Sequence, residues 1–258
     1  MNADDTLIAL GTIVRREVMR ILRIWSQTLL PPAITVTLYF IIFGSLIGRR
    51  IGEMAPGISY IEYIAPGLIM MSVIQNAYGN ITSSFFGAKF QRFVEEMLVS
   101  PMPSWTILAG YVSGAVLRGF MVGVIVLGIS LLFTKIHLYH PFVTLSTFVL
   151  AATIFGLLGF VNAIFARKFD DIAIIPTFVL TPLTYLGGVF YNVAQLPTPW
   201  KEISHLNPIL YMVSAFRYGL LGVAEINLVW AYAVMFGFVL ALGAFCLSLL
   251  HRGVGLRS

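Results

Sequence analysis

The stretch FFGAKFQRFVEEMLVSPMPSW, Phe85 to Trp105, is a short charged island between two long apolar runs. Within it, residues 86–99 predict an amphipathic helix, because apolar side chains recur at helical spacing. The apolar stripe is Phe86, Phe90, Phe93, Val94 and Met97, and the charged side chains beside it are Lys89, Arg92, Glu95 and Glu96. Pro101 ends the helix, since proline holds the residue before it in an extended backbone. Such a helix offers one face to a helix bundle and one to a soluble partner, although a solvated connector has the same pattern.

The composition around this island is that of an integral membrane protein. Of the 258 residues, 59% are hydrophobic and 10% are charged, and the mean hydropathy is +0.91. A soluble domain carries about 25% charged residues. The length suits one membrane domain, residues 1–258, without a separate soluble domain of ordinary size. The net charge of +5 is spread over the ends of apolar runs, so it does not indicate nucleic-acid binding.

Six runs of the sequence are nearly free of charge. They are Ile24–Gly48, Tyr63–Ala88, Trp105–Phe133, Phe142–Ala166, Ile172–Tyr191 and Ile226–Leu250. Each has at least the roughly 20 residues that a helix needs to cross the hydrocarbon core. Because a lone strand would leave its backbone groups unpaired in lipid, we predict an all-α fold with six transmembrane helices.

Six crossings would place both termini on the same side of the membrane. Ten lysines and arginines fall on that side and five on the other. This excess predicts that the termini lie in the cytoplasm.

Two segments outside the six runs have patterns of their own. Residues 6–25 predict an amphipathic helix at the cytoplasmic membrane interface, with arginines opposite its apolar face. That face consists of Leu7, Leu10, Val14, Val18, Ile21, Leu22 and Trp25. Residues 192–224 are apolar in patches but broken by prolines. An ordinary outward loop fits this second segment, and so do short helices that dip back into the membrane.

The sequence lacks the signatures of several function classes. None of the four lysines follows a glycine, so no G-x-x-x-x-G-K-[ST] loop is present to hold ATP. No Asp or Glu lies within the six runs, which argues against an ion-coupled secondary transporter or channel. All four histidines fall at or beyond the ends of runs, which disfavours an intramembrane enzyme. The single cysteine, Cys246, excludes a multi-cysteine metal site, and we expect no metal ion and no bound cofactor.

Arg118 is the one ionisable residue well inside a run. A charge there costs at least about 2.5 kcal/mol on insertion scales, so it should face the bundle interior or a wet cavity. A structural role, bonded to the backbone of a neighbouring helix, and contact with an anionic part of a substrate both remain open.

The order of residues in the charged island resembles the cytoplasmic coupling loop of type-2 ATP-binding cassette (ABC) exporter permeases. The resemblance rests on Glu95-Glu96 followed by Leu98-Val99-Ser100-Pro101, and on Asn207-Pro208 followed by Phe216-Arg217-Tyr218-Gly219. It is strongest with the small bacterial permeases that export drugs, polysaccharides and nodulation factors, and these two motifs with the runs between them cover most of the chain.

The resemblance implies a non-enzymatic subunit of the bacterial inner membrane that exports a lipophilic or amphiphilic substrate. Two permease copies, here expected as a homodimer in membrane lipid, would each dock on a separate ATPase subunit that holds ATP and Mg. The implied coupling residues are Lys89, Arg92, Glu95, Glu96, Leu98, Ser100 and Pro101. Short re-entrant helices within residues 192–224 are implied around Asn207, Pro208, Arg217 and Gly219. An ion-coupled secondary transporter or channel remains the alternative function.

Overall fold

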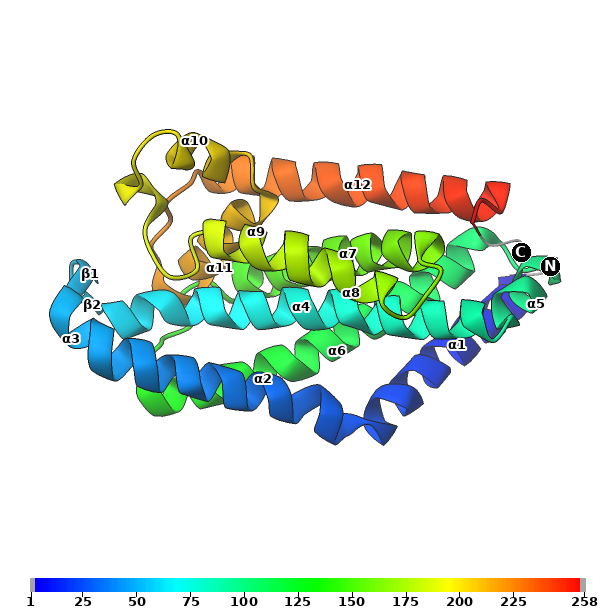
Figure 1. Cartoon of the computed structure of the whole chain (residues 1–258), viewed down its shortest axis with the longest axis horizontal. Helices are drawn as coiled ribbons and strands as arrows, with labels where there is room; N and C mark the ends of the chain where they lie inside the picture. The colour runs from blue at the N-terminus through cyan, green and yellow to red at the C-terminus, as the bar shows by residue number, and fades with distance from the viewer. Residues whose placement is uncertain (1–2, 256–258) are drawn as a thin grey trace.

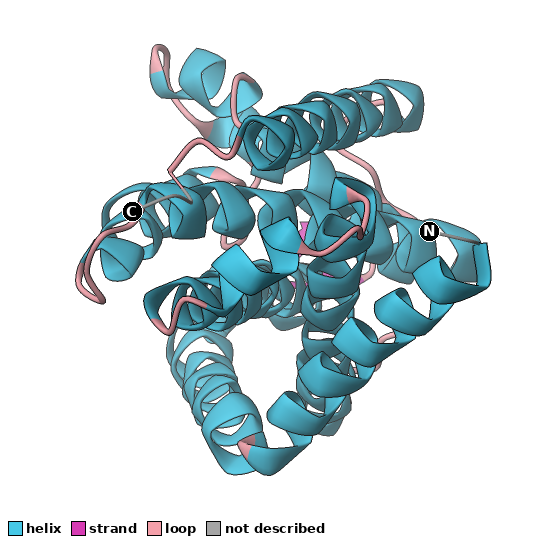
Figure 2. Cartoon of the chain, turned by 90° about the vertical axis from the view of Figure 1, so that its right-hand side faces the viewer, coloured by secondary structure: helices cyan, strands magenta, loops and turns pink. Residues whose placement is uncertain are grey.

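The computed structural model describes residues 3–255, which form an elongated bundle of helices (Figure 1). Both termini lie at one end of the bundle, beside α5, Phe93–Val99. A small hairpin, β1 Glu53–Ala55 and β2 Ile58–Ser59, lies at the opposite end. Figure 2, seen from the end that carries the termini, shows the helices side by side. The chain therefore runs back and forth between two ends.

The first helix is amphipathic, as expected. α1, Ala3–Arg23, runs obliquely to the bundle axis and buries Ile13, Glu17 and Ile21, and it packs against α6. Of the apolar face predicted for residues 6–25, Ile21 is buried, whereas Leu7 is 63% exposed and Trp25 55%. Part of the predicted apolar face is therefore left uncovered by protein, and its contact with the membrane interface stays a prediction.

The chain next forms a long apolar helix and then the hairpin. α2, Trp25–Tyr39, continues as a π-helix, η1 Phe40–Ile47, and ends in the short α3, Gly48–Ile51. This two-stranded hairpin is a small addition to a chain that is otherwise helical, as expected. Its last residue, Ser59, caps α4. The Glu62 carboxylate accepts hydrogen bonds from the Ser59 backbone N–H at 3.0 Å and hydroxyl at 2.8 Å. This Ser-x-x-Glu pattern is a helix-start signal.

The centre of the bundle is α4, Tyr60–Phe90, which packs against α6, Ser104–Phe133, and α7, Pro141–Phe165. The contact with α7 is close at Gly159, where an added Cβ would come within 2.5 Å of the Tyr78 carbonyl oxygen. Buried polar residues on α4 include Asn80, Thr82 and Ser84. They face other helices, which explains why α4 is less apolar than its neighbours.

The last third of the chain consists of several short helical segments followed by two longer helices. α8 Asp171–Ile175, the π-helix η2 Pro176–Leu180 and α9 Thr181–Leu186 follow one another without a break. A 3-10 turn, η3 Val193–Gln195, and two helices, α10 Trp200–His205 and α11 Pro208–Leu221, come next. α12, Leu228–Arg252, completes the bundle.

A helix lies in each of the six predicted runs, but they differ in length and apolarity. Within the described part of the chain, four stretches are long and apolar enough to cross a membrane: Trp25–Gly44, α6, α7 and α12. α4 has 31 residues but more polar side chains. The stretch Asp171–Leu186 is apolar but short, about 24 Å at 1.5 Å per residue. Length and hydropathy thus establish a helical membrane protein with four candidate spans.

Candidate functional site

The charged island of the sequence contains a sharp turn rather than one continuous helix. α4 extends to Phe90, and Arg92 then adopts the left-handed backbone region with φ of 63° before α5 begins. The prediction of a single helix over residues 86–99 is therefore wrong. α4 already reaches the end of the bundle, so a straight continuation would carry Val94 into solvent. The turn instead folds α5 back and buries Val94 to 2% exposure.

The second charged turn, residues 166–171, packs directly against the end of α4. The Lys89 ammonium donates hydrogen bonds to the backbone carbonyl oxygens of Ile164 and Ala166. The Phe169 ring contacts the ring of Phe86 at 5.0 Å between centroids and that of Phe90 at 5.1 Å. The two charged turns, residues 91–92 with α5 and residues 166–171, therefore lie together.

The Asp171 carboxylate closes this second turn. It accepts hydrogen bonds from the backbone N–H groups of Arg167 at 2.8 Å and Lys168 at 3.0 Å. These two N–H groups hold the pKa of Asp171 below its ordinary value, because they stabilise the charged form. The turn is thus a defined, charged surface at physiological pH.

A cavity of about 510 Å³ lies between these two turns and Gly255, which follows α12. Lys89, Arg92, Glu95 and Arg167 supply its charged lining. Beside it, α5 leaves Glu96 and Val99 exposed, and Val99 is 87% exposed.

The other predicted coupling residues complete the α5 turn. Leu98 is partly buried against the core, and the Ser100 hydroxyl donates to the Met97 carbonyl oxygen at 2.7 Å. Pro101 follows, exposed. The structure therefore brings all seven coupling residues to the end of the bundle that carries the termini, on or next to one polar surface.

The motif residues before the last helix hold α11 against the bundle. The Asn207 side chain accepts the Ile209 N–H at 3.0 Å and donates to the Leu183 carbonyl oxygen at 2.6 Å. Pro208 occupies the first turn of α11. A backbone N–H there would have no acceptor within the helix, so a proline loses no hydrogen bond at this position. A Cβ on Gly219 would come within 2.3 Å of the Thr144 hydroxyl oxygen, so only glycine permits this contact.

Arg217 lies wholly inside the protein. Its guanidinium pairs with the Glu225 carboxylate at 2.7 Å, donates to the Gly188 carbonyl oxygen at 2.7 Å, and stacks on the Tyr63 ring at 4.0 Å. A buried arginine needs a carboxylate partner, and Glu225 in the loop after α11 supplies one here. Whether this segment re-enters the membrane stays a prediction.

Arg118 lies about halfway along α6 and lines a polar cavity of about 290 Å³ between α2, α4 and α6. Its Nε donates to the Asn76 Oδ1 on α4 at 3.3 Å. The partner is thus a side-chain amide rather than the backbone carbonyls considered from the sequence. The cavity also contains Gln27 on α2 and Gln75 on α4.

Glu17 is a buried polar residue that the sequence analysis missed. It is fully buried on α1, pairs with Arg20 at 3.0 Å and accepts a hydrogen bond from the Ser84 hydroxyl. Arg20 in turn donates to the Asn80 Oδ1 at 2.6 Å. The sequence did contain a signal for this burial. Glu17 lies four residues from both Ile13 and Ile21, so it falls on the same side of the helix, between the two buried isoleucines.

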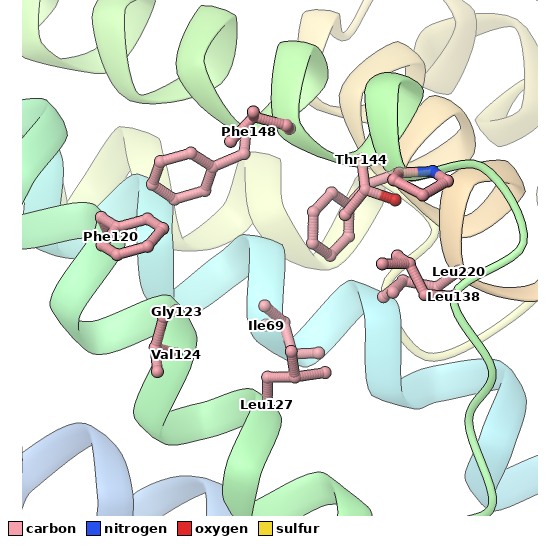
Figure 3. A pocket seen from close by; sticks show the side chains of 12 residues that line it. Ile69, Phe120, Gly123, Val124, Leu127, Leu138, Thr144, Phe148 and Leu220 are labelled. Carbon is pink, nitrogen blue, oxygen red and sulfur yellow. The ribbon is translucent and has the colours of Figure 1, made fainter.

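A separate cavity of about 310 Å³ is almost wholly apolar (Figure 3). Ile69, Val124, Leu127 and Phe148 line it, and Thr144 contributes a hydroxyl at its edge. It suits a hydrocarbon chain and offers no group for chemistry. In the part of the chain described here, no three His, Cys, Asp or Glu side chains gather as metal ligands would.

These features define a class: a helical membrane protein with a charged surface at one end and polar cavities among its helices. The sequence profile of the ABC-2 type transporter family matches residues 8–221. The chain therefore belongs to the ABC-2 type transporter family and is a membrane subunit of that family.

Two relatives agree with this assignment. The inner membrane transport permease YadH of Escherichia coli strain K12 is 56% identical over 251 residues, which span 97% of this chain and 98% of YadH. Nodulation protein J of Rhizobium leguminosarum biovar viciae is 25% identical over 186 residues, 72% of this chain and 71% of that protein. The similarity to YadH, together with the apolar helices, places the chain in the inner membrane.

Proposed function

We propose that the chain is the six-span permease of an ATP-driven exporter, with both termini in the cytoplasm. In this proposal two further segments cross the membrane in addition to the four apolar spans. α4 qualifies because Asn80, Thr82 and Ser84 are buried against other helices, so lipid does not meet them. The stretch Asp171–Leu186 qualifies because it starts at the end that carries the termini and the chain continues beyond it to η3.

The observation that carries the proposal is the meeting of the two charged turns at the end of the bundle with both termini. A soluble ATPase needs a rigid, exposed surface there. α5 is joined to α4 and α6, and Val94 anchors it in the bundle. The exposed Val99 and Glu96 lie beyond the helix bundle, where an apolar side chain beside charges suits a protein partner rather than lipid.

In this proposal two copies of the chain form a homodimer, each docked on a separate ATPase subunit. The ATPase holds ATP and Mg, and its closure moves the permease helices through α5. Symmetric pairs are the commonest assemblies, and one chain type is sufficient. The cargo is lipophilic or amphiphilic, since the cavities described above offer apolar and uncharged polar surface together with one arginine. The name of YadH, a transport permease, supports the transport function.

Replacing Glu95→Ala together with Glu96→Ala tests the docking surface. We expect this double variant to purify with at least about tenfold less ATPase than the parent. The reason is that truncating one member of an interfacial charge pair costs about 2 kcal/mol or more. The first step is to search the neighbouring reading frames for a Walker-A ATPase. The measurement is then co-purification with that ATPase, followed by ATP hydrolysis in proteoliposomes.

The matched control is Asp4→Ala with Asp5→Ala, which removes the same charge from α1 at the same end of the bundle. It should retain the ATPase. Equal retention by both double variants would show that α5 is only a connector. An export activity that persists without any ATPase and collapses with a protonophore would instead support the ion-coupled alternative.

A further inference from the structure

The cavity at Arg118 has the features of an anion site rather than of a structural contact. Arg118 sits about halfway along a 30-residue helix, far from both of its ends. The hydrogen bond to Asn76 uses only its Nε. Among the described residues, no carboxylate lies within ion-pair distance of this guanidinium. A charge held there without a counter-ion marks a functional site by default.

The surroundings of Arg118 leave its positive charge uncompensated. A second cation, Arg20, lies nearby: it donates to Asn80 on α4, one turn along from Asn76, the partner of Arg118. The carboxylate of Glu17 is already shared by Arg20, Arg16 and the Ser84 hydroxyl. The local field therefore favours an incoming anion.

The rest of the cavity matches the two halves of an amphiphile. Gln27, Thr35 and Gln75 line it with amide and hydroxyl groups, which hydrogen-bond a polar head. Val36, Leu68 and Met71 line it with apolar side chains. At about 290 Å³ the space holds a head group and the first carbons of a chain.

We propose that this cavity binds the phosphate-type anionic head group of an amphiphile through Arg118. The inference rests on the proposed transport function, for which it names the cargo class. The planar guanidinium has two terminal nitrogens that bind two oxygens of one phosphate at once, which favours arginine over lysine.

Binding of radiolabelled dodecyl phosphate to the purified permease in dodecyl maltoside micelles tests the proposal. We expect saturable binding to the parent, at least about tenfold weaker binding to Arg118→Gln, and intermediate binding to Arg118→Lys. Arg15→Gln is the matched control, because it removes an exposed arginine from α1, and it should bind as the parent does. Equal affinity of the parent and Arg118→Gln overturns the proposal.

A second variant keeps the test decisive if Arg118→Gln fails to fold. Gln75→Glu places a competing carboxylate in the cavity with little change of shape, and unchanged binding of dodecyl phosphate to this variant overturns the proposal.

A displacement experiment separates an amphiphile site from a site for a free anion. Inorganic phosphate should displace dodecyl phosphate only at far higher concentration. Displacement at similar concentrations would show that the site binds a free anion and that the amphiphile assignment is wrong. The binding assay needs no ATPase. A negative binding result therefore leaves the proposed ATPase docking untouched, and a negative docking result leaves the binding result valid.

Discussion

At the scale of single residues, two buried charges connect parts of the chain that are distant in sequence. Glu17 ties α1 to α4 through Arg20 and Ser84, and Arg217 ties α11 to the loop before α12 through Glu225. Neither was predicted to be buried. A charge is buried only where the fold supplies its partners. Ser84 lies 67 positions from Glu17 and Glu225 lies 8 from Arg217, whereas Arg20 lies 3 from Glu17.

The Arg217–Glu225 pair leads to a stability prediction. Glu225→Ala leaves a fully buried guanidinium without its carboxylate, at a cost of about 3–5 kcal/mol, and should lower the unfolding temperature by several degrees. Arg217→Met with Glu225→Leu removes both charges and should recover much of the loss. A thiol-reactive dye reports unfolding, because Cys246 is fully buried. Glu202→Ala, an exposed acid on α10, is the control, and equal stability of the two single variants would show that the ion pair contributes nothing.

At the scale of elements, the segment before α12 consists of two helices with opposite environments. α11 buries most of its apolar side chains, including Leu210 at 1% exposure. α10 instead exposes Trp200, Ile203 and Leu206, and Leu206 is 85% exposed. If this segment meets the outer leaflet, α10 is the part in contact with lipid, while α11 is shielded by protein.

Cysteine labelling in a Cys246→Ser background distinguishes these environments. We expect Leu206→Cys to react with an apolar maleimide but slowly with a charged, impermeant one, because lipid excludes the charged reagent. Pro197→Cys, exposed in the loop, should react with both reagents, and Leu210→Cys, buried, with neither. Reaction of Leu206→Cys with the charged reagent as fast as Pro197→Cys would mean that the segment is an ordinary aqueous loop.

At the scale of the whole molecule, the two ends of the bundle differ in character. One end carries both termini, α5 and the turn at residues 166–171, and the other carries the hairpin. The phenylalanine contacts and the Lys89 hydrogen bonds join the two turns at the first end. The arrangement fits an even number of crossings with one end specialised for a soluble partner.

Labelling from each side of the membrane tests this topology. Lys168→Cys and Pro56→Cys lie at opposite ends of the bundle, and both sites are exposed. In intact spheroplasts of a Cys246→Ser strain, an impermeant maleimide should label only Pro56→Cys, and lysis should expose Lys168→Cys. Labelling of both sites before lysis would contradict six crossings with cytoplasmic termini.

The sequence by itself determined the helical membrane class, the positions of the long helices and the family motifs. These depend on local properties: apolar runs long enough to cross lipid, charges at their ends, and short motifs around Glu95 and Asn207.

Only the tertiary structure decided which polar residues face the protein interior and which segments meet. The break at Arg92, the burial of Glu17 and Arg217, and the union of the turns at Lys89 and Phe169 each depend on partners far away in the sequence. The same holds for the cavity at Arg118, whose walls come from three helices. Periodicity shows that a helix has an apolar side. It does not show whether that side faces lipid or protein, because both environments accept apolar side chains. In α1 only the packing of the helices decides which side chains contact the rest of the protein.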